Sequence, residues 1–188
     1  GVQTCALPIL LTTRVGTVLA VWYAYQSEEH IGARLVLARK SSGAREWNKS
    51  EVLLAPLPYS VANPVLFDEP AAGKIWLLFV GLKGGHWNHG EVQAVWSDDD
   101  GKTWSDPDTV WTGRGVMVRH PPMATAEGLL LPAYDEASRQ AVLLRRTTGE
   151  RRWHEAHRFV SPPLLQPALV RDAPGRLSLF FRPWRDRK

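Results

Sequence analysis

The sequence repeats one short pattern four times. In each copy a glycine turn precedes an apolar run of strand length, rich in β-branched and aromatic residues. The runs are GTVLAVWYAY from Gly16, GKIWLLFVG from Gly73, GLLLPAYDE from Gly128 and GRLSLFFR from Gly175. Successive copies begin roughly 50 residues apart, which is the length of one propeller blade. The repeat therefore predicts a row of similar small sheets.

Further elements flank these runs at matching places. Each of the first three is followed by a second apolar strand, a polar turn with glycine and a closing tryptophan, namely Trp47, Trp104 and Trp153. A proline and a short apolar strand precede three of the glycine turns, and helix-period segments are essentially absent. We therefore predict an all-β fold of four-stranded antiparallel blades, of which about three and a half are present. Because propellers close on themselves, we expect the chain to be part of a longer protein.

Composition and the termini set further limits. The chain has 188 residues, is 44% hydrophobic and contains one cysteine, so no intrachain disulfide is expected. No apolar run is long enough to predict a membrane span. The first residues, GVQTCALPI, lack an initiator methionine and resemble translated adapter sequence. We expect residues 1–9 to be a non-native leader and residues 10–188 to form the propeller domain.

The charge pattern does not indicate a nucleic-acid partner. The net charge is +4, and basic residues outnumber acidic ones after residue 138. They are scattered over strand-like segments, with no basic helix and no RNA-binding aromatic signature, so a solvated basic face is favoured over nucleic-acid binding. His86 and His89 have a spacing compatible with a metal, but no third ligand is evident. No phosphate loop or dinucleotide fingerprint occurs, so neither a metal nor a cofactor is expected.

The segment SDDDGKTW is the most distinctive motif. Ser97 and Asp99 are residue types that accept hydrogen bonds from backbone amides in tight turns. Gly101 allows the positive φ that reverses the chain, Thr103 re-enters a strand, and Trp104 offers a large face to bury between sheets. None of these roles is chemistry on a substrate. The segment is predicted to be a structural hairpin.

With that motif as an anchor, most of the chain from Gly16 to Arg182 resembles the sialidase superfamily. The spacing in SDDDGKTW is that of its Asp box, or BNR repeat, and the flanking segments follow the family's order. The resemblance implies a six-bladed β-propeller and an exo-sialidase or related glycosidase that cleaves terminal acidic sugars from glycans. It also implies that the hairpin lies away from the active site, and it favours a secreted or periplasmic protein, although localisation is left open.

The resemblance also assigns candidate site residues. Three arginines clamp the sugar carboxylate in the family, and Arg182 matches one of them. Either Glu28 or Glu29, in the loop YAYQSEEHIG, stands in the place of the aspartate that protonates the leaving oxygen. Tyr134 and Glu136 occupy a sugar-contacting position. The remaining candidate substrate contacts are Arg119, a substitute cation, and Gln166 and Asn63, each beside a proline.

Simpler interpretations remain for these residues. Glu28 and Glu29 are also compatible with ordinary surface acids, and Tyr134 with simple packing. The family's tyrosine-activating glutamate is expected just before Gln166, where the sequence has Leu164 and Leu165. The sequence thus favours a sialidase-like glycosidase, and the alternative is a non-catalytic carbohydrate- or protein-binding propeller.

Overall fold

The computed structural model describes residues 3–4, 8–25, 32–54, 57–83 and 85–183. Glu28 and Glu29 lie outside the described residues. The described part is built from antiparallel strands and two short 3-10 helices, η1 (Pro70–Ala72) and η2 (Trp87–His89). None of its helices is long and apolar enough to cross a membrane. The all-β prediction is confirmed.

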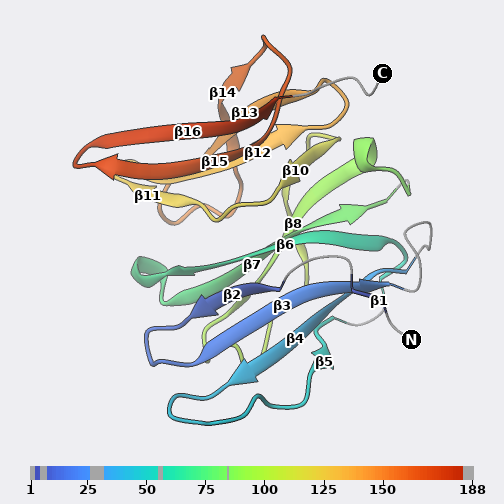
Figure 1. Cartoon of the computed structure of the whole chain (residues 1–188), viewed down its shortest axis with the longest axis vertical. Helices are drawn as coiled ribbons and strands as arrows, with labels where there is room; N and C mark the ends of the chain where they lie inside the picture. Colours follow the sequence, from blue (N-terminus) through green and yellow to red (C-terminus); the bar gives the residue numbers. More distant parts are fainter. Residues whose placement is uncertain (1–2, 5–7, 26–31, 55–56, 84, 184–188) are drawn as a thin grey trace.

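The strands form four sheets in sequence order (Figure 1). The first contains β1 (Gln3–Thr4), β2 (Ile9–Thr12), β3 (Val18–Tyr25), β4 (Arg34–Lys40) and β5 (Glu51–Val52). The second contains β6 (Ser60–Glu69), β7 (Lys74–Leu82), β8 (Gly90–Ser97) and β9 (Asp108–Trp111). The third contains β10 (Val116–Val118), β11 (Met123–Thr125), β12 (Gly128–Asp135), β13 (Gln140–Arg146) and β14 (His154–Phe159). The fourth contains β15 (Leu164–Ala173) and β16 (Arg176–Pro183).

The repeated glycine turns identify corresponding strands of successive sheets. The four runs predicted from the sequence become β3, β7, β12 and β16, each preceded by an antiparallel partner. The four-stranded antiparallel blade is therefore confirmed, and a total of six blades stays a prediction. The boundary after residue 9 also stays a prediction, although Gln3, Thr4 and Ile9 pair with β3.

The first strand of the second, third and fourth sheets is interrupted near a proline. In β6 the pairing with β7 shifts register between Ala62 and Val65, around Pro64. In β15 the same shift occurs between Leu165 and Ala168, around Pro167. In the third sheet the strand is split into β10 and β11, which flank residues 119–122 with their two prolines. Because proline has no N–H to donate to the ladder, each interruption releases a few residues from regular pairing.

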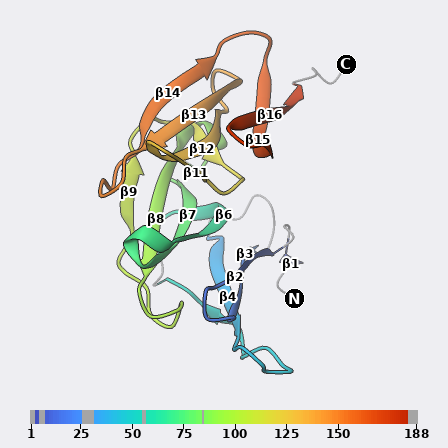
Figure 2. The same cartoon turned by 90° about the vertical axis from the view of Figure 1, so that its left-hand side faces the viewer.

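Two hydrophobic clusters join neighbouring sheets. One lies between the first two sheets and includes the fully buried side chains of Leu19, Leu77 and Phe79. The other joins the second, third and fourth sheets and includes Met117 and Leu165. Figure 2 shows the sheets following one another along the long axis. Since each sheet has an apolar face toward its neighbour, the frame is held mainly by burial between sheets.

A buried ion pair reinforces the junction of the second and third sheets. Arg146 Nη2 lies 2.6 Å from Glu69 Oε2, and both side chains are less than a tenth exposed. The same carboxylate oxygen accepts a hydrogen bond from Trp76 Nε1 at 2.7 Å. The Arg146 guanidinium also lies over the rings of Trp76 and Trp153, at 4.6 and 5.2 Å. A buried charge paired in this way fixes how the two sheets meet.

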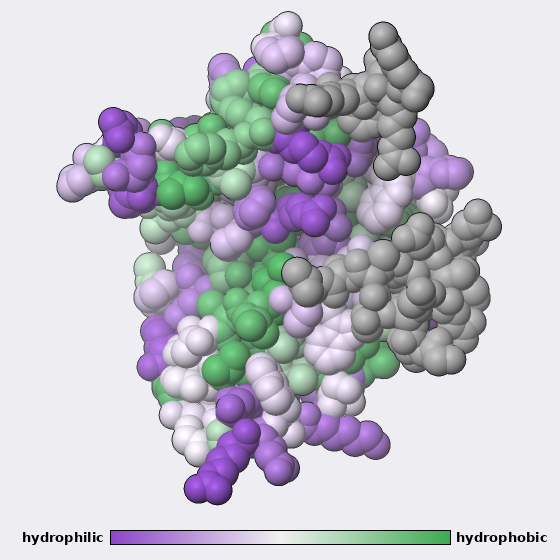
Figure 3. Space-filling view, in the orientation of Figure 1, coloured by the Kyte–Doolittle hydropathy of each residue, from purple (hydrophilic) through white to green (hydrophobic). Residues whose placement is uncertain are grey.

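The fourth sheet carries one of the apolar areas of the visible surface. Figure 3 shows hydrophobic residues gathered over β15 and β16. Phe180 is 63% exposed and Val170 is 43% exposed. In the interior of a propeller such side chains pack against a neighbouring blade, as those of the first three sheets do here.

Candidate functional site

The strands present two ends, and they differ in character. Along β7 and β8, Ile75 pairs with Ser97 at one end and Leu82 with Gly90 at the other. Seven residues of strand separate the two ends, which is a distance of about 23 Å. The SDDDGKTW turn lies at the first end, and η2 lies at the second. Each end is therefore considered separately.

The SDDDGKTW turn is tied together by its own side chains. Ser97 Oγ accepts a hydrogen bond from the Gly101 amide at 2.8 Å. Asp99 accepts hydrogen bonds from the amides of Lys102 and Thr103 at 3.0 and 2.9 Å and from the Thr103 hydroxyl at 2.6 Å. The bonds from Thr103 are the largest cause holding the pKa of Asp99 well below its usual range. Asp99 is thus an ionised turn-forming group at neutral pH.

The same turn contacts the preceding sheet. Asp100 Oδ2 accepts hydrogen bonds from Thr17 Oγ1 at 2.6 Å and from Arg39 Nη2 at 3.2 Å. Gly101 has φ +74°, and a Cβ at this position would lie 2.9 Å from a methyl carbon of Leu19. Trp104 is partly buried against the cluster that joins the first two sheets. These contacts join the turn to the preceding sheet. The structural role of Ser97, Asp99, Gly101, Thr103 and Trp104 stays a prediction.

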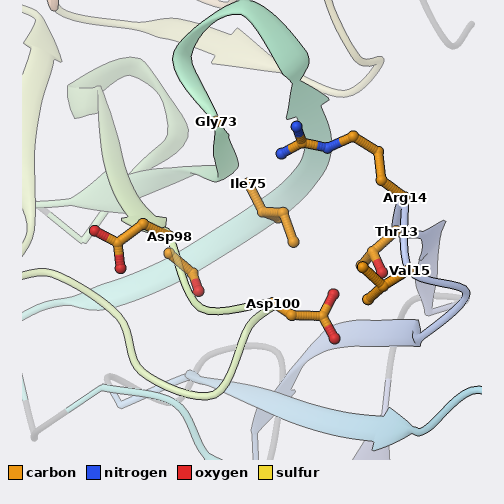
Figure 4. Close-up of a pocket in the computed structure, with 8 residues that line it drawn as sticks. Thr13, Arg14, Val15, Gly73, Ile75, Asp98 and Asp100 are labelled. Atoms are coloured by element: carbon orange, nitrogen blue, oxygen red, sulfur yellow. The ribbon is translucent and has the colours of Figure 1, made fainter.

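A small pocket opens beside this turn (Figure 4). It has a volume of about 220 Å³ and is lined by Thr13, Arg14, Asp98 and Asp100, among others. In the close-up Asp100 points toward Thr13, whereas Asp98 is turned away. Arg14 Nε is paired with Asp68 at 2.9 Å, and Asp100 is paired with Arg39. Because its main charged groups are already paired, this pocket offers little to a charged ligand.

The opposite end gathers the predicted substrate contacts. Tyr134, only 2% exposed, accepts a hydrogen bond from Asn63 Nδ2 at 3.4 Å and also bonds to Gln166. These three residues come from the second, third and fourth sheets. The charges of Arg119 and Glu136 act on Tyr134, and that of Arg182 acts on Glu136. Six of the eight candidates thus lie near one another, and the other two, Glu28 and Glu29, are outside the described residues.

Asn63 and Gln166 are held in an uncommon backbone conformation. Their φ values are +48° and +50°, and each residue directly precedes a proline at the interruption of its strand. A non-glycine residue in the left-handed region costs about 1 kcal/mol or more, so the surrounding structure must impose it. The two positions correspond in successive sheets, and both side chains reach the same phenol.

Tyr134 is a neutral phenol at ordinary pH. Burial is the largest cause that raises its pKa, and the negative charge of Glu136 acts in the same direction. Hydrogen bonds with Gln166 and Asn63 and the charge of Arg119 oppose this rise in pKa but do not reverse it. Tyr134 therefore serves as a hydrogen-bonding hub that positions Asn63 and Gln166, rather than as an anion.

The charged candidates surround this hub at the surface. Arg119 and Arg182 are exposed, and neither forms an ion pair with another described residue. Glu136 is partly buried, and this burial raises the pKa of its carboxyl, while the charge of Arg182 pulls that pKa down. His120, next to Arg119, has its pKa lowered by burial and then by the Arg119 charge. Two uncommitted guanidinium groups beside polar side chains form an arrangement suited to a carboxylate.

One part of this end was not predicted from the sequence. An open pocket of about 480 Å³ is lined by His86, Trp87 and Asn88 of the η2 segment together with Glu136. The two histidines of GGHWNHG were considered only as metal ligands, and the described residues hold no group of three or more potential metal ligands. The signal that could have found the pocket is an aromatic residue in a glycine-rich loop at the same strand end as PAYDE.

Comparisons with known proteins agree with the observed sheets. The family model described as "BNR repeat-like domain" matches residues 16–188. A search of curated protein sequences finds no significant match. Among solved structures, a Hadza microbial sialidase shares 18% sequence identity at a TM-score of 0.70, with 94% of this chain and 41% of that chain covered.

Two further solved structures are similar. The intramolecular trans-sialidase from Ruminococcus gnavus has 12% identity and a TM-score of 0.71, with 95% of this chain and 65% of that chain covered. A protein of unknown function from Dyadobacter fermentans has 15% identity and a TM-score of 0.74, with 95% and 62% covered. The chain spans less than two thirds of the length of each, and at these identities the likeness concerns the fold. On the strength of the family match over residues 16–188, the chain belongs to the BNR repeat-like domain family, with a sialidase-like fold.

Proposed function

We propose that this protein is a glycosidase of the sialidase-like class, acting on terminal acidic sugars of glycans. The observation that carries the proposal is the meeting of Asn63, Tyr134 and Gln166 beside Arg119 and Arg182. This group forms at the strand end opposite the SDDDGKTW turn, and its residues come from three successive sheets. A glycan with an acidic terminal sugar is the proposed partner, because its carboxylate and its hydroxyls match these two kinds of group.

In this proposal the arginines bind the sugar carboxylate. A guanidinium presents its N–H groups in a planar fork that matches the two oxygens of a carboxylate. Arg182 is the last residue but one of β16, and Arg119 follows β10, so each is placed by the end of a strand. The amides of Asn63 and Gln166, oriented by the buried phenol of Tyr134, would donate to or accept from sugar hydroxyls.

The hydrolytic step requires a proton donor for the leaving oxygen. We assign this role to Glu29 or Glu28, which the resemblance places in the loop after the first long strand. A glutamic acid works as a general acid when partial burial keeps it protonated near neutral pH. Glu136 is the partly buried carboxyl on the described side of the site, and its contact with substrate is proposed as binding rather than proton transfer.

A matched pair of arginine substitutions tests the proposal. Arg182→Ala removes a free guanidinium at one end of β16, whereas Arg176→Ala removes an exposed one, paired with Asp172, at the other end. In the full-length protein, Arg182→Ala should weaken binding of an acidic monosaccharide by about 30-fold or more, corresponding to about 2 kcal/mol. Arg176→Ala should leave it unchanged. Equal binding by both variants would remove Arg182 from the site.

A binding platform without catalysis is the second candidate. It is favoured by Leu164 and Leu165, which stand where the resemblance expects a glutamate, and Leu165 is completely buried. An assay of the full-length protein on a fluorogenic sialoside separates the two candidates. Release of the fluorophore that depends on Glu28 or Glu29 supports the glycosidase, and Arg182-dependent binding without release supports the platform.

A further inference from the structure

One exposed arginine near the candidate site has no role in the arrangement described above. Arg114 lies in the loop between β9 and β10 and is exposed. Trp111, the last residue of β9, pairs with Val92 near the start of β8, so this loop lies at the same end of the sheets as η2. Arg114 forms no ion pair with another residue that the structure describes. Its guanidinium is therefore available to an anion.

The backbone holds the Arg114 loop against the turn that follows β12. The Gly115 amide donates to the Gly90 carbonyl, and the Glu136 amide donates to the Gly115 carbonyl, both at 2.9 Å. A Cβ at Gly115 would lie 3.2 Å from a carboxylate oxygen of Asp135, so the absence of a side chain suits this close approach. The residue next to Arg114 is thus fixed beside the turn that carries Glu136.

Arg119 and Arg182 supply further positive charge around the same turn. The charge of Arg182 acts on the Glu136 carboxyl, and that of Arg119 acts on Tyr134, two residues earlier in the chain. Arg114 belongs to the connection between the second and third sheets, whereas Arg182 belongs to the fourth sheet. The turn after β12, in the third sheet, thus has an arginine in the connection before its sheet and another in the sheet after it.

The carboxylates described at this end do not balance the three arginines. Glu91 is already paired with Lys83 at 2.6 Å, and Asp135 with Arg158 at 3.0 Å. Glu136 is a single carboxylate, and it forms no ion pair within the described part of the chain. The described charges therefore leave an excess of positive charge at this end, which attracts anions and speeds their encounter with the protein.

We propose that the acidic glycan bound here carries at least two anionic groups, one near Arg182 and Arg119 and a second at Arg114. The first anion rests on the proposed function, and the second goes beyond it. A ligand with one carboxylate leaves Arg114 to water, whereas a second carboxylate or sulfate gains a further charge-assisted contact. Glu136 disfavours an anion beside it, so the two acidic groups must be separated along the ligand.

A glycan is favoured over a nucleic acid as the polyanion. Asn63 and Gln166 bring amide groups to this end, and amides donate to and accept from sugar hydroxyls. Nucleic acids are bound through rows of phosphate contacts along a continuous basic face. Here the arginines are single residues at strand ends and in one loop.

The experiment measures dissociation constants of the full-length protein at about 50 mM and about 500 mM sodium chloride, which differ in charge screening. The probes are 3′-sialyllactose, the same compound with a sulfate on the galactose 6-hydroxyl, lactose carrying two sulfates, and a thymidine trinucleotide. The variant is Arg114→Gln. Its matched control is Arg152→Gln, which removes another exposed arginine without an ion pair to a described residue, from the turn between β13 and β14 at the opposite end.

At low salt the wild-type protein should bind the sulfated sialyllactose about 5-fold more tightly than 3′-sialyllactose, which corresponds to about 1 kcal/mol. At high salt this preference should shrink to about 2-fold or less. Arg114→Gln should abolish the preference and leave the affinity for 3′-sialyllactose unchanged, and Arg152→Gln should match the wild type.

Three other outcomes are informative. Equal binding of the two sialyllactoses by the wild type, or a preference that survives in Arg114→Gln, would overturn the inference. Binding of the trinucleotide as tightly as disulfated lactose would overturn the assignment to a glycan. Arg114-dependent binding of disulfated lactose, without any binding of 3′-sialyllactose, would support the second anion site and count against the proposed function alone.

Discussion

The contact between the SDDDGKTW turn and the first sheet can be tested with one methyl group. Gly101 has φ +74°, and a Cβ there would lie 2.9 and 3.0 Å from the two methyl carbons of Leu19. Leu19 is completely buried in the cluster between the first two sheets, so any shift of its methyl carbons must be made among other core side chains. Gly101→Ala should therefore add a close contact to the backbone strain of a left-handed alanine.

The two costs can be separated by a control in the same sheet. Gly73 has φ +65°, and a Cβ there would meet nothing within 4 Å. Gly73→Ala should thus lower the free energy of unfolding by about 1 kcal/mol, from backbone strain alone. Gly101→Ala should lower it by about 2–4 kcal/mol, because overpacking a filled core adds about 1–3 kcal/mol.

The measurement is urea unfolding of the full-length protein and both variants, followed by tryptophan fluorescence. The informative quantity is the difference between the two alanine variants, because the strain is common to both. Leu19→Ala should cost less in the Gly101→Ala background than in the wild type, because the space left by the leucine side chain accommodates the added methyl group. If Gly101→Ala and Gly73→Ala are equally stable, the turn does not press on Leu19, and the account of how the first two sheets are joined is wrong.

Three further predictions concern stability. Asp99→Asn should lower the free energy of unfolding by about 1 kcal/mol at pH 7. Because folding lowers the pKa of Asp99, this contribution is present above about pH 4 and fades as the pH falls. The urea midpoints of the wild type and the variant should therefore converge in acid. Glu69→Ala should cost about 3–5 kcal/mol by stranding the Arg146 charge, whereas the double change Glu69→Leu with Arg146→Met should restore most of it, as calorimetry would show. Gln166→Gly should be about 1 kcal/mol more stable than Gln166→Ala, since glycine relieves the strain at φ +50°; equal stabilities would contradict imposed strain.

Local features of this molecule could be predicted from the sequence because their contacts are local. The hydrogen bonds of Ser97 and Asp99 span two to four residues, so residue types and spacing define the turn. The strands that follow glycine turns were predictable for the same reason. The register in which β6 and β15 pair could not be predicted in this way. A proline shifts that register relative to the partner strand, so the shift depends on two strands and not on one local segment.

The candidate site was predictable only as a set of separate residues. The hydrogen bond between Asn63 and Tyr134 joins positions 71 residues apart, and no local pattern encodes that meeting. The resemblance supplied Tyr134 and Gln166, but the positive φ of Asn63 and Gln166 came from the structure. The place of Trp87 in the wall of the open pocket could not be predicted, because a single exposed tryptophan in a loop has no periodicity to interpret.

The two strand ends differ in how their charged groups are paired. At the turn end, two carboxylates are satisfied by neighbours: Asp99 by its own turn, Asp100 by Thr17 and Arg39. At the other end, neither Arg182 nor Glu136 forms an ion pair with another described residue, although a closer pairing would offset the effect of burial, which raises the pKa of Glu136. A frame joined firmly at one end can hold strained or unpaired groups at the other, because the sheets cannot move to satisfy them. The groups left unsatisfied are therefore the ones available to a ligand, and a carboxylate at Arg182 together with hydroxyls at Glu136 would satisfy both.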